Sequence, residues 1–334
     1  MNVGKYVYIY THQQTAKEST VMNNTLIATS QALTVEGCSA LIEPYVASLD
    51  AAPRSKDTYR KAVKRFFEWY AGQGIEAPTR EDILAYKADL MSKYKACTVS
   101  SYMSAVKSFF AFLEATGRYP NIAAGIKGAK ATRGFRKDAL SAAQAVRVIS
   151  GIDRSTLEGL RDYALVNLLI RTGLRTIEAE RADIGDIRAE TGESLLYIQG
   201  KGRDSKDAFV VLTEATAQPI REYLRARGKQ ADSAPLFASC SDRNNGERLT
   251  TRSISRIVKE ALKRVGLDSD RLTAHSLRHT AVTLSLLAGA TIQEAQQLAR
   301  HSSVNTTMIY AHNIDRIARA PERRIDELLE NTSA

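Results

Sequence analysis

A change of composition in the middle of the chain is the strongest constraint on its fold. Residues 121–138 read NIAAGIKGAKATRGFRKD, where glycine, alanine and basic residues replace the regular apolar spacing seen on either side. Such a stretch is typical of a linker, because it offers no apolar face to bury. The chain has 334 residues, which is more than one hydrophobic core usually organises. The sequence therefore predicts two domains, joined by a basic linker over residues 127–138.

The first half of the chain shows helical periodicity. SKDTYRKAVKRFFEWYAGQGI places Val63, Phe66 and Tyr70 three and four residues apart, which predicts a helix with one apolar face. TREDILAYKADLMSKY and TVSSYMSAVKSFFAFLEATG repeat the pattern. We therefore expect about four helices, packed as a small bundle, over residues 35–126.

The charge balance suits a polyanionic partner. Lysine and arginine number 47 against 37 acidic residues, a formal net charge of +10, although charge alone predicts only nonspecific attraction. A solvated surface would explain one basic helix face, but the bias recurs in several predicted helices, which favours a DNA-facing surface. For the basic residues of the linker, a solvated segment and a DNA-facing segment are equally good explanations. The candidate DNA-binding residues are Arg54, Lys56, Arg60, Lys61, Lys64, Lys107, Lys130, Arg133 and Arg136.

Residues 139–312 predict a second, mainly α domain with a small antiparallel sheet. GLRDYALVNLLIRTGLRTIEAERADIGDI indicates a buried helix, a turn at Gly173 and another helix. Arg175 and Glu178 are three residues apart on that second helix and therefore share a face. SLLYIQGKGRDSKDAFVVLT is typical of a β-hairpin, with Lys201 near the end of its first strand.

The stretch HSLRHTAVTLSLLAGATIQEAQQLARHSSVNTTMIY collects three histidines, two arginines and a terminal tyrosine. His275 and His279 have the spacing of two metal ligands, but the intervening glutamate of H-E-x-x-H is missing and Arg278 would bring a cation to the metal. A helix-turn-helix would explain DNA binding, but it would leave Arg175 and Lys201 without a role.

Metal-free phosphoryl transfer on a DNA backbone would use all of these residues. Two guanidiniums, those of Arg175 and Arg278, could clamp the charge that grows on the phosphate oxygens in the transition state. A tyrosine hydroxyl can form a covalent ester that conserves bond energy, and a lysine or histidine can protonate the leaving oxygen.

Four motifs carry a resemblance to a known family. TGLRTIEAERADIGDI, IQGKGRDSKDAFVVL, HSLRHTAVT and LARHSSVNTTMIYAH occur in this order. They resemble the first-arginine, lysine-hairpin, H-x-x-R and histidine–nucleophile motifs of the tyrosine recombinases of the phage integrase and Xer type. The resemblance runs from about Leu33 to Arg316. It implies a SAM-like core-binding bundle and a mainly α catalytic domain with a small sheet, which together form a C-shaped DNA clamp.

The resemblance also implies roles for the site residues. Tyr310 would attack the scissile phosphate, form a 3′-phosphotyrosyl link and release a 5′ hydroxyl. Arg175 and Arg278 would hold the nonbridging oxygens, with Glu178 bracing Arg175. Lys201 would be the general acid for the 5′ oxygen.

The family's histidines and one departure complete the comparison of motifs. His275 would accept the proton of the nucleophile or orient the phosphate, and His301 would hydrogen-bond the phosphate. His279 is expected to have a structural role. The family usually has glycine before the second-box histidine, whereas this chain has Arg300, which would add a phosphate contact or alter the packing of that loop.

The expected activity is site-specific recombination of double-stranded DNA by a homotetramer, through a four-way junction and without metal, ATP or another cofactor. Accessory DNA-bending or directionality factors are conceivable partners. Integration or excision of a mobile element is favoured over Xer-like dimer resolution or DNA inversion. A type IB topoisomerase and a catalytically silent DNA-binding regulator are further alternatives. The amphipathic tail over residues 313–334 is expected to exchange between protomers, with packing on its own domain as the alternative.

The remaining features concern location and the N-terminus. The three cysteines lack C-x-x-C spacing, and no apolar run approaches the roughly 20 residues that cross a bilayer. We therefore expect a cytoplasmic, nucleoid-associated protein without membrane partners. Residues 1–34 are expected to form a flexible extension, and Met22 is an alternative to Met1 as the start of translation.

Overall fold

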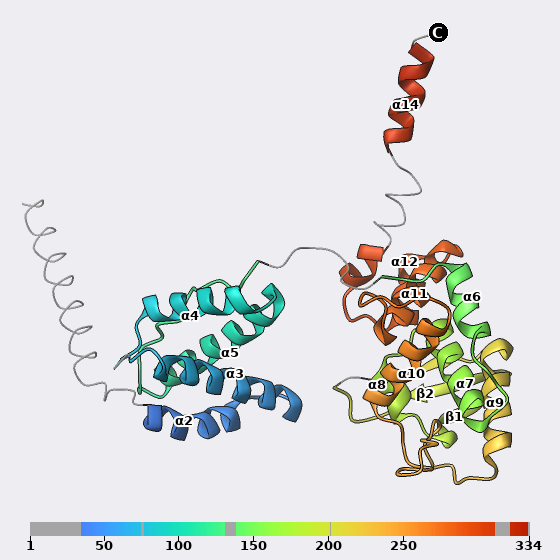
Figure 1. Cartoon of the computed structure of the whole chain (residues 1–334), viewed down its shortest axis with the longest axis horizontal. Coiled ribbons are helices and arrows are strands. Elements are labelled where there is room, and N and C mark those ends of the chain that lie inside the picture. Colours follow the sequence, from blue (N-terminus) through green and yellow to red (C-terminus); the bar gives the residue numbers. More distant parts are fainter. Residues whose placement is uncertain (1–34, 75–76, 131–137, 201, 311–320, 333–334) are drawn as a thin grey trace, which may run out of the picture. The chain divides into compact units, whose positions relative to one another are not determined.

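The chain folds mainly into helices, with one small antiparallel sheet, which confirms the predicted fold class (Figure 1). The computed structural model describes residues 35–74, 77–130, 138–200, 202–310 and 321–332. Two compact units divide the chain, Met1–Arg133 and Gly134–Ala334. The predictions for the N-terminal extension and for Arg133, Arg136 and Lys201 lie outside the described residues.

Four helices build the described part of the first unit. Pro53 begins one of them, where its missing N–H would have had no intrahelical partner. Another begins after Thr79, whose backbone N–H and hydroxyl both donate to the Asp82 carboxylate at 2.8 Å. The helices are α2 (Val35–Ser48), α3 (Pro53–Ala71), α4 (Arg80–Lys93) and α5 (Ala96–Ala115).

Aromatic side chains fill the core of this bundle. Phe66 of α3 is completely buried, and its ring centroid lies 5.1 Å from that of Tyr86 and 5.8 Å from that of Phe110, both edge to face. Such contacts add to the free energy gained by burying the rings. The apolar face of α3 is thereby held against α5, and its basic residues lie on the remaining surface.

The second unit has more helices and contains the sheet. Ser141 caps the first of them, because its hydroxyl accepts from the Gln144 N–H. The helices are α6 (Ala142–Ser150), α7 (Leu157–Thr172), α8 (Thr176–Arg181), α9 (Glu214–Arg227), α10 (Thr251–Arg264), α11 (Ala274–Leu287), α12 (Ile292–Ala299) and α14 (Pro321–Thr332). Residues 304–310 are also helical.

The sheet contains three strands in the order β1-β2-β3, whereas the sequence predicts a hairpin of two. The additional strand is β1 (Ile187–Glu190), which pairs with β2 (Glu193–Ile198); β2 also pairs with β3 (Ala208–Val211). Thr191 and Gly192 link β1 to β2, and both have positive φ, as a tight two-residue hairpin turn requires. β1 was not predicted because it has only four residues, two of which, Ala189 and Glu190, are of types depleted in strands.

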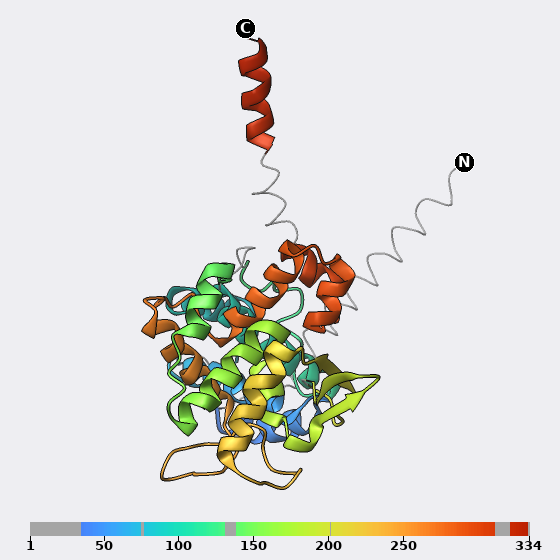
Figure 2. The same ribbon diagram turned by 90° about the vertical axis from the view of Figure 1, so that its right-hand side faces the viewer.

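Helix α7 lies at the centre of the core of this unit. Its residues Ala164, Leu165, Val166 and Leu168 are completely buried, and α9 and α11 pack against it. Figures 1 and 2 both show α7 and α9 side by side. The end of α7 is therefore a rigid base for the segment that follows it. No helix in the described part of the chain is long and apolar enough to cross a membrane.

Candidate active site

The turn between α7 and α8 positions the first candidate arginine. Gly173 ends α7 in the left-handed conformation, with φ of 62°. Arg175 then precedes α8, and its backbone N–H donates to Glu178 Oε2 at 2.8 Å while its Nη1 donates to Oε1 at 2.7 Å. The Glu178 carboxylate thus fixes both the backbone and the guanidinium of Arg175.

Glu178 is completely buried, although it carries a charge. Burial on its own raises the pKa of Glu178, but Arg300 and then Arg175 outweigh burial and hold the pKa below its usual value. A buried carboxylate is tolerated when charged hydrogen-bond donors compensate it. Glu178 therefore remains ionised at neutral pH.

The first turns of α11 carry three further candidate residues. His275, Arg278 and His279 are separated by three and four positions, so they lie on one side of the helix. Arg278 is 2% exposed; it donates to the Gly173 carbonyl at 2.7 Å and to the Ala299 carbonyl. Burial, Arg175 and Arg300 lower the pKa of Arg278 to about 10, so it stays positively charged at neutral pH.

One cavity brings the two arginines and a histidine together. Its volume is about 430 Å³, and its lining includes Arg175, His275 and Arg278. Guanidiniums in a concave, partly dehydrated site attract an anion more strongly than the same groups in bulk water. The cavity is thus suited to hold a phosphate group.

The candidate nucleophile is buried in this structure. Tyr310 is 4% exposed and packs against Val282, Ala295 and Ala299. Its hydroxyl forms a hydrogen bond with Nδ1 of His279. Burial raises the pKa of Tyr310 to about 12, against the opposing effect of Arg278. The histidine that is hydrogen-bonded to this hydroxyl is thus His279. The ring of His275 contacts the ring of His279 edge to face, with 4.5 Å between the ring centroids.

His301 lies next to Tyr310, after the end of α12. Its ring is stacked with that of Tyr310 at 6.2 Å between centroids, and its Nδ1 is 2.9 Å from the hydroxyl oxygen of Thr307, which is completely buried. Thr307 orients the ring but had not been predicted, since nothing in SSVNTTMIY distinguishes it from Thr306. Arg300, singled out only as a departure from the family pattern, also belongs to the site.

The environments of His279 and His301 predict acid sensitivity of the second unit. Burial first, and then neighbouring positive groups, lower the pKa of each to about 4; Arg278 acts on both, His275 acts on His279, and Arg175 acts on His301. The unfolded histidines bind protons below about pH 6.5, so stability is fully present above that pH and is lost as the pH falls toward 4. We expect the free energy of unfolding to fall by about 1–3 kcal/mol between pH 7 and pH 5.

This acid sensitivity can be measured by urea unfolding followed by circular dichroism. The free energy of unfolding of the His279→Gln variant should fall less steeply with decreasing pH than that of the wild type, because the variant lacks one of the two histidines with a lowered pKa. Trp69, the single tryptophan, lies in α3 of the first unit, so its fluorescence provides an internal control that the substitution should not change. An equal pH slope in both proteins would contradict the prediction.

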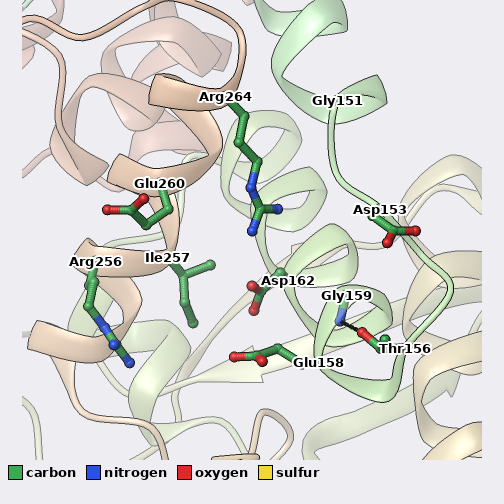
Figure 3. A pocket seen from close by; sticks show the side chains of 10 residues that line it. All are labelled: Gly151, Asp153, Thr156, Glu158, Gly159, Asp162, Arg256, Ile257, Glu260 and Arg264. Carbon is green, nitrogen blue, oxygen red and sulfur yellow. Dashed lines mark hydrogen bonds between the residues drawn. The ribbon is translucent and has the colours of Figure 1, made fainter.

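Another cavity of about 440 Å³ lies between the start of α7 and α10 (Figure 3). It contains none of the predicted site residues. Four carboxylates face it against two guanidiniums, so it offers no net attraction for a phosphate. The charged lining residues are Asp153, Glu158, Asp162, Glu260, Arg256 and Arg264.

The candidate DNA-binding residues of the first unit differ in their availability. Arg60 donates to both carboxylate oxygens of Glu43, at 2.8 and 2.9 Å, and Lys61 Nζ lies 2.8 Å from Asp57. Lys56 and Lys107 are half-buried. The remaining three are exposed and form no salt bridge with the residues that the structure describes; they are Arg54, Lys64 and Lys130.

Comparison with known proteins identifies the family of this chain. The phage integrase family matches residues 139–316, and the N-terminal SAM-like domain of phage integrases matches residues 44–117. The tyrosine recombinase XerA of Pyrococcus furiosus is 30% identical over 295 residues, which cover 88% of this chain and 96% of the relative.

Solved structures of recombinases share the fold. The XerH site-specific recombinase bound to palindromic difH in a post-cleavage complex has a TM-score of 0.69 at 20% identity, over 85% of each chain. The lambda integrase tetramer bound to a Holliday junction has a TM-score of 0.64 at 19% identity, over 86% of this chain and 80% of that one. Together, the family match and the relatives show that this chain belongs to the phage integrase family and is a tyrosine-type site-specific DNA recombinase.

Proposed function

We propose that this recombinase integrates and excises a mobile genetic element, and that it cleaves DNA through Tyr310. The observation that carries the proposed chemistry is the cavity of about 430 Å³, whose lining includes Arg175, His275 and Arg278. Arg175 is at least 100 positions away from His275 and Arg278 in the chain, yet the two guanidiniums and the imidazole line one cavity.

The proposed reaction needs no energy source other than the DNA itself. The Tyr310 hydroxyl gives its proton to a neighbouring neutral imidazole. Its oxygen bonds to the scissile phosphorus, and the bond from phosphorus to the 5′ oxygen breaks. Arg175 and Arg278 stabilise the charge on the nonbridging oxygens, and Lys201 gives the 5′ oxygen its proton. Because the phosphotyrosyl ester conserves the energy of the broken bond, a 5′ hydroxyl from a second strand can reverse the step.

The supporting histidines have separate roles in this proposal. His275 lines the cavity and orients the phosphate, and His301 hydrogen-bonds the phosphate when DNA is bound. His279 keeps the Tyr310 hydroxyl hydrogen-bonded in the DNA-free protein. Glu178 fixes Arg175.

The proposed assembly is a homotetramer that holds two double-stranded DNA sites. In this proposal, the first unit contacts the DNA phosphates through Arg54, Lys64 and Lys130. The amphipathic sequence of α14 supports exchange of the tail between protomers, because its apolar residues Leu328 and Leu329 follow Ile325 by three and four positions and share one face with it. DNA-bending or directionality factors would assist, and the protein would act at the nucleoid in the cytoplasm.

The name of the relative XerA favours Xer-like recombination between two copies of one site as a second candidate. Mobile-element integration joins two different sites, whereas dimer resolution joins identical ones. A recombination assay with matched and unmatched site pairs separates the two functions. Efficient exchange only between identical sites would overturn the integration proposal.

The cleavage chemistry can be tested with a nicked suicide substrate. DNA segments that flank the gene are nicked beside each candidate crossover point and incubated with the protein in EDTA. We expect a protease-sensitive covalent adduct, and mass spectrometry of its digest should place the nucleotide on the peptide that contains Tyr310. Tight binding without an adduct would favour a silent DNA-binding regulator, and relaxation of supercoiled DNA by a monomer would favour a topoisomerase.

A further inference from the structure

Arg300 adopts a backbone conformation that favours glycine. It follows the last residue of α12, and its φ and ψ are 51° and 48°, in the left-handed region. A side chain at this position crowds the backbone, which is why glycine usually ends a helix in this way. An arginine here is therefore expected to make interactions that compensate for the unfavourable backbone.

The side chain of Arg300 points into the protein and connects three elements. Its Nη1 donates to the Leu298 carbonyl of α12 at 2.7 Å. Its Nη2 donates to the Gly173 carbonyl at the end of α7 at 3.3 Å, and to Glu178 Oε2 of α8 at 2.9 Å. The side chain is only 15% exposed. Its Nε is buried without a hydrogen-bond partner in the described part of the chain. Because burying an unpaired donor costs free energy, the other hydrogen bonds of Arg300 must offset this cost.

Two of the three partners of Arg300, the Glu178 carboxylate and the Gly173 carbonyl, also hold the two arginines that line the cavity of about 430 Å³. Glu178 accepts from Arg300 with one carboxylate oxygen and from the Arg175 guanidinium with the other. The Gly173 carbonyl accepts from both Arg300 and Arg278. The carbonyl of Arg300 itself accepts from Arg175 Nη2 at 3.2 Å.

We infer that Arg300 is a positioning residue for strand cleavage, which acts through the shared Glu178 carboxylate to fix the Arg175 guanidinium at the scissile phosphate. This inference rests on the proposed role of Arg175. Arg300 takes up one oxygen of the carboxylate, so that Glu178 can rotate less and Arg175 keeps a single orientation. A guanidinium that is already oriented costs no reorganisation when charge develops on the phosphate.

A direct phosphate contact by Arg300 fits the structure less well. Both of its terminal nitrogens already donate to the protein, and the lining of the cavity includes Arg175 and Arg278 but not Arg300. A phosphate contact through Nη2 would require the Glu178 ion pair or the Gly173 hydrogen bond to break, and Nε is buried.

The test compares single-turnover cleavage of a saturating suicide substrate with DNA affinity. Arg300→Gly removes the side chain and gives the backbone the residue that its conformation favours. We expect the cleavage rate to fall about 10- to 100-fold, with DNA affinity and its salt dependence unchanged. Arg300→Lys, which keeps the charge next to Glu178, should restore part of the rate. Thermal unfolding of each variant verifies that the second unit remains folded.

A double-mutant cycle tests the route through Glu178. If Arg300 acts through this carboxylate, the double variant should cleave almost as fast as Glu178→Gln alone, because Glu178→Gln has already broken the link from Arg300 to Arg175. If the losses of cleavage rate from the two substitutions were fully additive in free energy, Arg300 would not act through Glu178. A wild-type cleavage rate in Arg300→Gly would overturn the inference as a whole. Weaker DNA binding, with a salt-dependence slope reduced by about one, would also overturn it, because that change indicates a lost phosphate contact.

Two further arms separate this inference from the proposed function. Arg225→Ala removes the same charge from an exposed position on α9 and should cleave at the wild-type rate. If the wild-type protein forms no adduct, the proposed chemistry fails and the inference falls with it. If the wild type forms the adduct and Arg300→Gly does so equally fast, only the role of Arg300 is disproved.

Discussion

Tyr310→Phe should abolish the covalent protein–DNA adduct, with a loss of cleavage rate of at least about 10⁴-fold, and should leave DNA binding unchanged. The removed hydroxyl is the atom that bonds to phosphorus in the proposed reaction. The phenyl ring can keep its packing against Val282, Ala295 and Ala299, so the fold should persist. The measurement is adduct formation on the nicked substrate, beside an affinity measurement on the uncut site.

A matched substitution checks that the effect belongs to this tyrosine. Tyr197→Phe removes a hydroxyl that donates to Glu190 on the surface of the sheet, and it should cleave normally. A residual adduct in Tyr310→Phe would identify a different nucleophile. The lost hydrogen bond to His279 should change the free energy of unfolding by only about 1 kcal/mol.

The neighbourhood of Tyr310 restrains the hydroxyl of the proposed nucleophile in the DNA-free protein. Burial raises the pKa of Tyr310 to about 12, so the reactive phenolate is scarce at neutral pH. His279 and His301 both have pKa values of about 4 and are neutral there. A neutral imidazole can accept the phenolic proton, whereas a protonated one cannot. The lowered histidine pKa values are therefore compatible with nucleophile activation at physiological pH.

The fold was predictable wherever the signal is local. Apolar spacing in the first unit gives its helices, and Val63, Phe66 and Tyr70 are all buried, as predicted. The glycine-marked turn at Gly173 is also observed. Strand β1 was not predictable, because it has only four residues and two of them, Ala189 and Glu190, are of types depleted in strands.

Contacts between distant parts of the chain explain the other differences. Arg60 looks like a free cation in the sequence, but Glu43 of the neighbouring helix neutralises it. The link from Arg300 to Glu178 spans 122 positions, and no local pattern indicates it. The motifs indicate the candidate reactive side chains, whereas the hydrogen-bond network around them depends on how α7, α8, α11 and α12 pack.

Arg278→Lys should lower the cleavage rate by about 10²–10³-fold, the usual loss when one transition-state donor is removed. Lysine keeps the charge, but it loses the planar group that can hold two phosphate oxygens at once. It also cannot reproduce both donations of Arg278, to the Gly173 and Ala299 carbonyls. Because those carbonyls are left short of a donor, we expect a loss of unfolding free energy of about 1–3 kcal/mol as well.

Kinetics and stability must therefore be measured on the same samples. The rate at saturating substrate reports the lost transition-state contact, and urea unfolding reports the lost structural donors. Arg256→Lys is the matched control, since Arg256 lines the separate cavity of Figure 3 and should cleave at the wild-type rate. If Arg278→Lys were only destabilised, lowering the temperature would restore its rate. A deficit that persists in fully folded protein would place the Arg278 guanidinium at the phosphate, and a wild-type rate would remove Arg278 from the proposed chemistry.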